Sequence, residues 1–97
     1  MSEKLNRQTA IAHRSFEVQN QPQEQVDVFI GKPFEIEECH WACPYRIVGA
    51  GEDMNFQIYG VDSIQALQLA FQVIDSAIEG AELELLWGEE KFLGFCN

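Results

Sequence analysis

The clearest pattern of apolar and polar positions lies between Ile64 and Glu79. Apolar side chains recur there at spacings of three and four residues, which is typical of one face of an α-helix. The apolar set comprises Ile64, Ala66, Leu67, Leu69, Ala70, Phe71, Val73, Ile74, Ala77 and Ile78. This arc is about twice as wide as a helix on one sheet needs. We therefore expect either that the sheet and the C-terminal tail cradle the helix, or that a homodimer forms through Ile64 to Ile78.

The residues flanking this segment carry signals for a helix start and a helix end. Asp62 is a strong N-cap residue, and Gln65 stands three positions later, as in a capping box. Gly80 follows the last periodic residue and fits a C′ position in the left-handed region. The pattern predicts a helix over 64–79 with Asp62 as its cap.

Upstream of the helix, apolar and polar residues alternate with a period of two, which indicates strands. Strands are predicted over 9–18, over 26–37 as a bent edge strand interrupted at 31–33, over 45–48 and over 55–60. Connections are predicted at 19–25, which is rich in Gln and Asn, at 38–44, and at the glycine-containing turn 49–53.

After the helix, residues 82–88 alternate Glu82 and Glu84 with Leu83 and Leu85, and this predicts a fifth strand. The tail contains Phe92, Leu93 and Phe95, so we expect it to dock on the domain. The element order β-β-β-β-α-β predicts an α+β fold, an antiparallel sheet of four to five strands covered on one face by a single long helix. Residues 1–97 form one domain, with 1–8 as a loose lead-in anchored by Leu5 alone.

Composition narrows the possible partners. The 97 residues include 6 Lys and Arg against 16 Asp and Glu, a formal charge of −10. This charge repels phosphate groups, so we expect no binding to nucleic acid or to a membrane surface. No apolar run reaches the roughly 20 residues that span a bilayer, and no secretory signal is evident, so a cytoplasmic location is expected.

Residues 60–70, GVDSIQALQLA, resemble the segment in which carrier proteins attach phosphopantetheine to a serine, here Ser63. Carrier proteins, however, are small four-helix bundles, whereas the sequence before and after this segment predicts strands. Helix capping by Asp62 explains the same residues. We therefore predict no attached cofactor.

Cys39, His40 and Cys43 are residue types that bind zinc, and Cys96 could complete a set. Structural zinc sites usually contain two closely spaced pairs, and this C-H-x-x-C pattern has only one, so free thiols are expected and no metal is predicted. Cys43 with His13 or His40 as a base would make a nucleophile, but the sequence shows no such pairing, so no catalytic residue is assigned.

Two groups of residues are candidates for binding. Trp41, Cys43 and Tyr45 could line a pocket, although aromatic residues in small domains more often fill the core. Glu35 with Glu37, and Glu82 with Glu84, form same-face carboxylate pairs that are typical of a solvated surface. If their strands are neighbours, these four glutamates form one acidic interaction surface.

The combination W-x-C-P-Y-R-I at 41–47 and G-V-D-S-I-Q-A-L at 60–67 resembles a family of small bacterial proteins of unknown function. The resemblance implies a single bacterial domain and no particular site. The leading hypothesis is a non-enzymatic protein-interaction module, by analogy with small acidic immunity or partner-binding proteins. The alternative is a small-ligand-binding domain or minor enzyme that uses Trp41, Cys43 and Tyr45.

Overall fold

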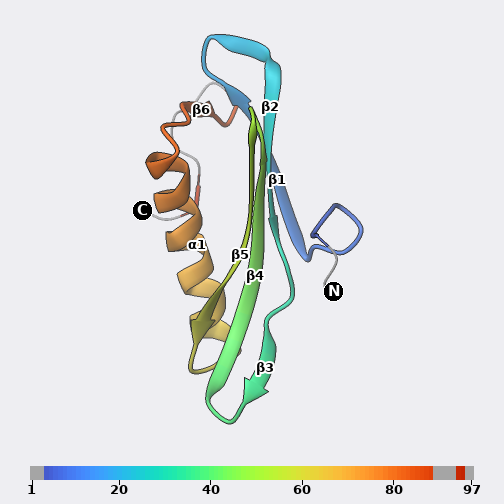
Figure 1. Ribbon diagram of the computed structural model, residues 1–97, viewed down its shortest axis with the longest axis vertical. Helices are drawn as coiled ribbons and strands as arrows, with labels where there is room; N and C mark the ends of the chain where they lie inside the picture. Colours follow the sequence, from blue (N-terminus) through green and yellow to red (C-terminus); the bar gives the residue numbers. More distant parts are fainter. Residues whose placement is uncertain (1–3, 89–93, 96–97) are drawn as a thin grey trace.

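Alternating side chains give the sheet one strongly apolar face, and the single long helix covers that face (Figure 1). The computed structural model describes residues 4–88 and 94–95. The elements are β1 (Ala12–Val18), β2 (Gln21–Ile30), β3 (Phe34–Glu37), β4 (His40–Gly49), β5 (Glu52–Gly60), α1 (Ser63–Gly80) and β6 (Leu85–Leu86). The predicted α+β fold, an antiparallel sheet with one covering helix, is confirmed.

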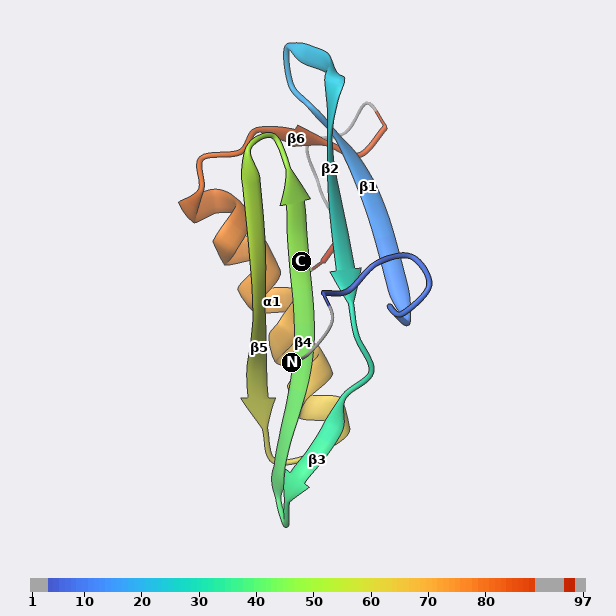
Figure 2. The same cartoon turned by 45° about the vertical axis from the view of Figure 1, so that its right-hand side comes forward.

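Strand β4 is the centre of the sheet. It pairs with β5 along one side, and with both β2 and β3 along the other. Strands β2 and β3 lie end to end against β4, since β2 pairs with 45–49 and β3 with 40–42. Strand β1 pairs with β2, and the short β6 pairs with β1. Figure 2 shows β5 as one margin of the sheet, with α1 running diagonally behind it.

The interruption predicted at 31–33 is confirmed, and it explains how Pro44 fits inside β4. The Pro44 carbonyl accepts a hydrogen bond from the Gly31 N–H at 2.8 Å. The nitrogen of Pro44 therefore faces the gap between β2 and β3, where its missing N–H breaks no ladder bond. The prediction of a connection over 38–44 is consequently wrong beyond Cys39, because β4 already begins at His40.

The prediction of a loop over 19–25 is also wrong for most of its length. Only Gln19 and Asn20 form the turn, with Asn20 at φ 67°, and β2 begins at Gln21. The register against β1 shifts between Glu17 and Val18, so 22–24 fall between two paired positions. Polar composition indicated a loop, but these residues extend a hairpin, in which Gln23 and Glu24 are exposed.

The core lies between α1 and the sheet. Its fully buried side chains include Phe16, Val26, Val28, Cys43, Ile47, Ala66, Ala70 and Ile74. On the helix, the buried positions Ala66, Ala70, Ile74 and Ile78 recur every four residues. Small residues at 66 and 70 let the first half of the helix approach the sheet closely. A Cβ at Gly60 would lie 2.5 Å from the Ala66 nitrogen, so β5 must end in glycine here.

The start of α1 agrees with the prediction. The Asp62 carboxylate accepts a hydrogen bond from the Gln65 N–H at 2.7 Å, and Asp62 is the N-cap. The Gln65 side chain accepts the Val61 N–H at 2.8 Å, one residue before the partner of an ordinary capping box. The Asp62 carboxylate thus satisfies one backbone donor that the first turn of the helix leaves unpaired, and the Gln65 side chain satisfies a donor in the segment leading into it.

The end of α1 differs from the prediction. Gly80 remains helical, and the left-handed residue is Glu82 at φ 57°. The Glu82 N–H donates to the Glu79 carbonyl at 3.0 Å, and the Leu83 N–H donates to the Ile78 carbonyl at 3.2 Å. These two bonds form a Schellman motif with glutamate at the position that glycine usually occupies.

Part of the wide apolar arc of α1 is explained by the C-terminal tail. The Phe71 ring lies 6.3 Å from the Phe95 ring, which in turn lies 5.6 Å from Phe16 of β1. Docking of the tail is therefore seen at Phe95, while Phe92 and Leu93 lie outside the described residues. Ile64 remains 66% exposed.

Both ends of the chain reach the sheet. The fifth predicted strand shortens to β6, because 82 and 83 belong to the helix end. At the other end, Leu5 is not the sole anchor of the lead-in. Its carbonyl accepts the Arg46 guanidinium at 2.9 Å, and the Lys4 ammonium contacts Asp53 at 2.9 Å.

Candidate binding surface

The predicted pocket residues lie on the helix-covered face of β4. Cys43 and Tyr45 are buried, and Trp41 is half-buried against the same core. The Cys43 thiol donates to the Gly31 carbonyl at 3.6 Å, and burial raises its pKa to about 11. The structure therefore places all three side chains among packed core residues, and Cys43 is held in the unreactive thiol form.

The histidines considered as bases for Cys43 lie on the other side of the sheet. His13 contacts Asp27, and the His40 ring makes a tilted contact with Tyr59, both on the face without the helix. Cys39 is exposed in the turn between β3 and β4, while Cys43 is in the core. Cys96 lies outside the described residues. Within 4–88 and 94–95, no group of three potential ligands gathers in a geometry that could hold a metal ion.

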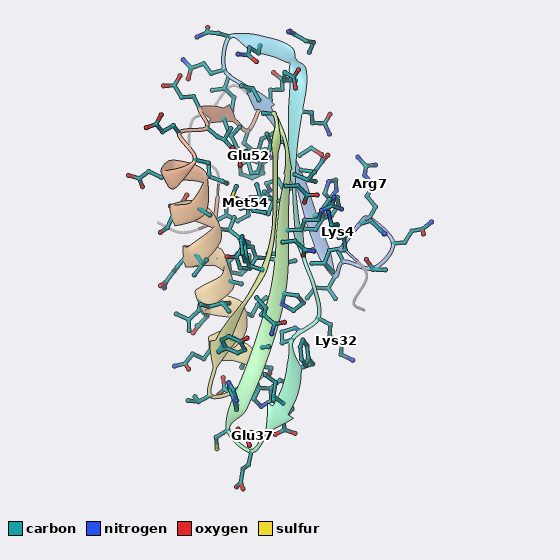
Figure 3. All side chains as sticks on the ribbon, viewed as in Figure 1. Lys4, Arg7, Lys32, Glu37, Glu52 and Met54 are labelled. Atoms are coloured by element: carbon teal, nitrogen blue, oxygen red, sulfur yellow. The ribbon has the colours of Figure 1, made fainter. Side chains whose placement is uncertain are left out.

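The four candidate glutamates do not form one surface. Strands β3 and β6 lie at opposite ends of the strand order, so Glu35 and Glu37 are far from Glu82 and Glu84. Glu82 is also not on a strand, because it occupies the Schellman turn. Figure 3 shows Glu37 at the tip of the molecule beside β3. The prediction that Glu35 and Glu37 share a face is also wrong, because Glu35 pairs with Trp41 and Glu37 with His40, whose side chains lie on opposite faces of the sheet.

The face of the sheet opposite α1, which we call the open face, carries half-exposed apolar side chains near β3. Phe34 and Tyr59 both pair across the sheet with Ala42, so the three side chains form one row on this face. Phe34 is 44% exposed, Tyr59 47% and the nearby Ile36 47%. Ile36 lies at the register shift between Glu35 and Glu37, two residues beyond Phe34. We call Phe34, Tyr59 and the neighbouring Ile36 the open-face patch.

A hollow of about 470 Å³ adjoins the open-face patch. Its lining is Leu5, Phe34, Pro44, Asn55, Phe56, Gln57 and Tyr59. The His40 ring lies 5.3 Å from the Tyr59 ring, and the Gln57 amide donates to the Tyr59 hydroxyl at 3.0 Å. These two contacts hold the tyrosine ring at the edge of the hollow and give the hollow one aromatic wall.

A polar lock closes the middle of the open face. Arg46 donates two hydrogen bonds to the Asp53 carboxylate, at 2.9 and 3.0 Å, and Lys4 adds a third contact. Hydrogen bonds from Arg46 and Lys4 hold the pKa of Asp53 well below its usual range. Because Arg46 also holds the Leu5 carbonyl, the lock positions Leu5 at the edge of the hollow. Figure 3 shows Lys4 and Met54 on opposite sides of the sheet.

A polar cluster, which sequence reasoning missed, joins β1 to β2 on the same face. The Asp27 Oδ1 atom accepts the Ser15 hydroxyl at 2.6 Å and the Gln25 amide at 3.0 Å, and it lies 3.0 Å from the His13 Nε2 atom. The His13 ring stacks on Phe29, with 4.7 Å between the ring centres. Partial burial acts to raise the Asp27 pKa, but the hydrogen bonds from Ser15, His13 and Gln25 outweigh it and lower the pKa.

This cluster contains serine, histidine and aspartate, but not in the arrangement of a catalytic triad. In a triad the aspartate and the serine bind different nitrogens of the imidazole. Here Ser15 and Asp27 face the same Nε2 atom, and the serine hydroxyl donates directly to the aspartate. The cluster is therefore a structural clasp between two strands. The sequence could have indicated this cluster only through the pairing of Ser15 with Asp27, and that pairing requires the register of the 12–30 hairpin to be known.

A comparison with known protein families identifies the family of this chain. A model for a domain of unknown function, DUF6968, matches residues 12–96. The chain belongs to this family. The match spans β1 through the C-terminal tail, so the open face and the helix-covered face are both part of the family domain. The family resemblance drawn from the sequence is confirmed at that level.

Other comparisons add no relatives. No curated protein and no solved structure matches the chain. Among the described residues, no helix has both the length and the apolar character needed to cross a membrane.

Proposed function

We propose that this chain is a non-enzymatic protein-interaction module of the bacterial cytoplasm, and that its open-face patch binds a segment of a partner protein. The observation that carries the proposal is the exposure of Phe34, Ile36 and Tyr59 beside the hollow. Exposed apolar side chains are common when scattered, but a cluster beside a concave site is typical of a binding surface.

The chemistry around the patch indicates which kind of segment fits. Glu35, Glu37 and Glu38 are exposed in and after β3, next to the patch, and the whole chain carries a charge of −10. A partner segment with one large apolar side chain for the hollow and flanking Lys or Arg residues complements both features. Because the contacts with His40 and Gln57 already hold the Tyr59 ring, less entropy is lost there on binding.

The other functions that the sequence allowed have less support. A small-ligand site or minor enzyme at Trp41, Cys43 and Tyr45 would require these side chains to leave the core. A homodimer through the helix alone would rely chiefly on Ile64, since the other apolar helix residues are buried or half-buried.

The proposal is tested with a random peptide library displayed on phage and the purified chain as bait. We expect enriched peptides to share an aromatic or large aliphatic residue flanked by Lys or Arg. Binding to a Tyr59→Ser variant should fall by about ten-fold or more, as for loss of an interface anchor. Ile64→Ser is the matched control, because Ile64 is also an exposed apolar residue but lies on the helix.

Two results contradict the proposal. One is a selection with no enrichment above background. The other is a set of peptides that bind Tyr59→Ser and the unmodified chain equally. Circular dichroism of each variant confirms that the fold is intact before binding is compared.

A further inference from the structure

Strand β5 has an unpaired edge of unusual length and composition for a domain of this size. Its nine residues, Glu52–Gly60, pair with β4 in an unbroken register and, within the described chain, with no other strand. Edge strands are usually protected by shortness, proline, lysine or bulges. The other outer strands follow this rule, since β3 has four residues with two glutamates and β6 has two residues. Strand β5 is long and contains no proline, lysine or bulge, and its two acidic residues, Glu52 and Asp53, stand together at one end.

The backbone groups on the free edge can be assigned. The Pro44 carbonyl bonds to Gly31 of β2, so Pro44 and its β5 partner Gln57 form a non-hydrogen-bonded pair. Hydrogen-bonded and non-hydrogen-bonded pairs alternate along an antiparallel ladder. The N–H and C=O groups of Asp53, Asn55, Gln57 and Tyr59 therefore point away from β4, toward the outer margin that Figure 2 shows.

We propose that β5 pairs with β5 of a second copy of this chain, antiparallel and centred on Phe56, to form a homodimer with one continuous sheet. This register aligns all nine residues and places Asn55 opposite Gln57 and Asp53 opposite Tyr59, each pair exchanging two hydrogen bonds. Phe56 meets its own counterpart in a non-hydrogen-bonded pair, where side chains approach most closely.

The side chains of β5 are complementary to themselves in this register. On the helix-covered side, Met54, Phe56 and Ile58 present an apolar row, and this register sets Met54 opposite Ile58 of the second copy. Phe56 is 60% exposed in the single chain, and the pairing would cover it. A parallel arrangement would instead set Glu52 against Glu52, which costs free energy.

Charge does not prevent the antiparallel pairing. Asp53 is already neutralised by Arg46 and Lys4. The Glu52 residues of the two copies lie at opposite ends of the shared ladder, about 27 Å apart at 3.4 Å per residue. The helix flank opposite Phe71 faces β5 by helical geometry, so half-buried Leu69 and Val73 lie toward the same junction. The β5 edge adjoins the open-face patch, because Tyr59 belongs to both, and Phe56 and Gln57 also line the hollow.

The first test blocks one edge donor. Gln57→Pro removes an N–H that the single chain does not use in its own ladder, and proline is tolerated on edge strands for that reason. Gln57→Ala is the matched control because it keeps the N–H. In sedimentation equilibrium at 0.3 M salt, we expect a dimer for the unmodified chain and for Gln57→Ala. The dissociation constant of Gln57→Pro should be about ten-fold higher or more, because the dimer loses two hydrogen bonds by symmetry.

The second test reports the register and does not depend on proline being tolerated. Cys39 and Cys96 are replaced by serine, and a single cysteine is introduced as Phe56→Cys or Glu52→Cys. Opposed positions in a non-hydrogen-bonded pair lie about 4.5 Å apart at Cα, within the range that a disulfide requires. Mild oxidation should therefore cross-link Phe56→Cys and leave Glu52→Cys monomeric on a non-reducing gel.

The proposal is overturned by a chain that stays monomeric up to millimolar concentration, or by equal cross-linking of the two cysteine variants. A dimer unaffected by Gln57→Pro but lost in Ile64→Ser would assign self-association to the helix instead. Tyr59→Ser changes a side chain and keeps the β5 backbone donors, whereas Gln57→Pro removes a backbone donor, so peptide binding and dimerisation fail separately.

Discussion

The two faces of strand β4 show how one strand serves two environments. On one face, Cys43, Tyr45 and Ile47 are buried under α1. On the other, Pro44 and Arg46 alternate with them and are only half-buried, with no helix above. The first face is covered by apolar packing against α1, which does not depend on the direction of any single contact. The second is closed by a few directional contacts, namely the Arg46 lock and the Asp27 clasp.

This difference explains where free surface remains. Apolar packing under a helix seals a face completely, because each side chain gains contacts wherever it turns. Polar contacts cover only the residues that they join. The contacts of Arg46 and of Asp27 do not include Phe34 or Tyr59. The open face therefore combines a stable polar centre with an apolar end that is available for binding.

The largest effect should come from the sealed face. Ile47→Ala removes buried methyl and methylene groups beneath α1 and is expected to lower the free energy of unfolding by about 2 to 4 kcal/mol. Phe34→Ala on the open face should cost less than about 1 kcal/mol, because the ring is already half exposed. Urea unfolding followed by tryptophan fluorescence measures both. Equal losses would remove the distinction between the faces.

The anchor of the helix that seals the core is the next test. Asp62→Ala removes the side-chain acceptor of the Gln65 N–H and should cost about 1 kcal/mol. The neighbouring Ser63→Ala should change stability by less than about 0.5 kcal/mol, since Ser63 is inside the helix.

Incubation with coenzyme A and a phosphopantetheinyl transferase should leave the mass of the chain unchanged. A mass increase that Ser63→Ala abolishes would restore the carrier interpretation.

The clasp on the open face is tested by pH. The folded-state pKa of Asp27 is lowered, so its contribution is present above the unfolded pKa, near 3.8, and is lost as pH falls through the folded value. Asp27→Asn should lower the free energy of unfolding at pH 7 by about 1 kcal/mol and flatten its decline below about pH 4.

Glu17→Gln controls for the loss of one negative charge on the same pair of strands. Removing a charge from a chain at −10 reduces repulsion, so this variant should be neutral or slightly stabilising. The prediction fails if the free energy of unfolding of Asp27→Asn falls with decreasing pH as steeply as that of the unmodified chain. The acid sensitivity would then come from other groups, of which Asp53 is the first to test.

The smallest effect is a gain at the far end of the helix. Glu82→Gly relieves the left-handed backbone of the Schellman turn and should stabilise the chain by about 0.5 to 1 kcal/mol. Its melting temperature should rise by about 2 to 8 °C. Glu84→Gly, in an extended segment, should lower it. A loss of stability in Glu82→Gly would mean that the carboxylate itself makes a contribution larger than the strain.

Sequence reasoning succeeded where a single local rule decides the outcome. The helical period set α1 to within one residue at either end, the cap at Asp62 followed from its side chain, and the break at 31–33 followed from Pro33. It failed at 19–25 and 38–44, where polar residues and Pro44 suggested loops. At 21 and 25 the paired strand β1 keeps the segment extended, and at Pro44 the gap between β2 and β3 means that the missing N–H breaks no ladder bond.

By itself the sequence determined the α+β class, the helix with its capped start, the two-residue period of the strands and the acidic charge. Only the tertiary structure decided that Trp41, Cys43 and Tyr45 face the core, that the four glutamates are separated, and that His13, Ser15 and Asp27 meet. The physical reason is that period and capping depend on neighbours within four residues of the chain. Which faces and edges remain free depends on strand order and register, which bring together residues far apart in sequence.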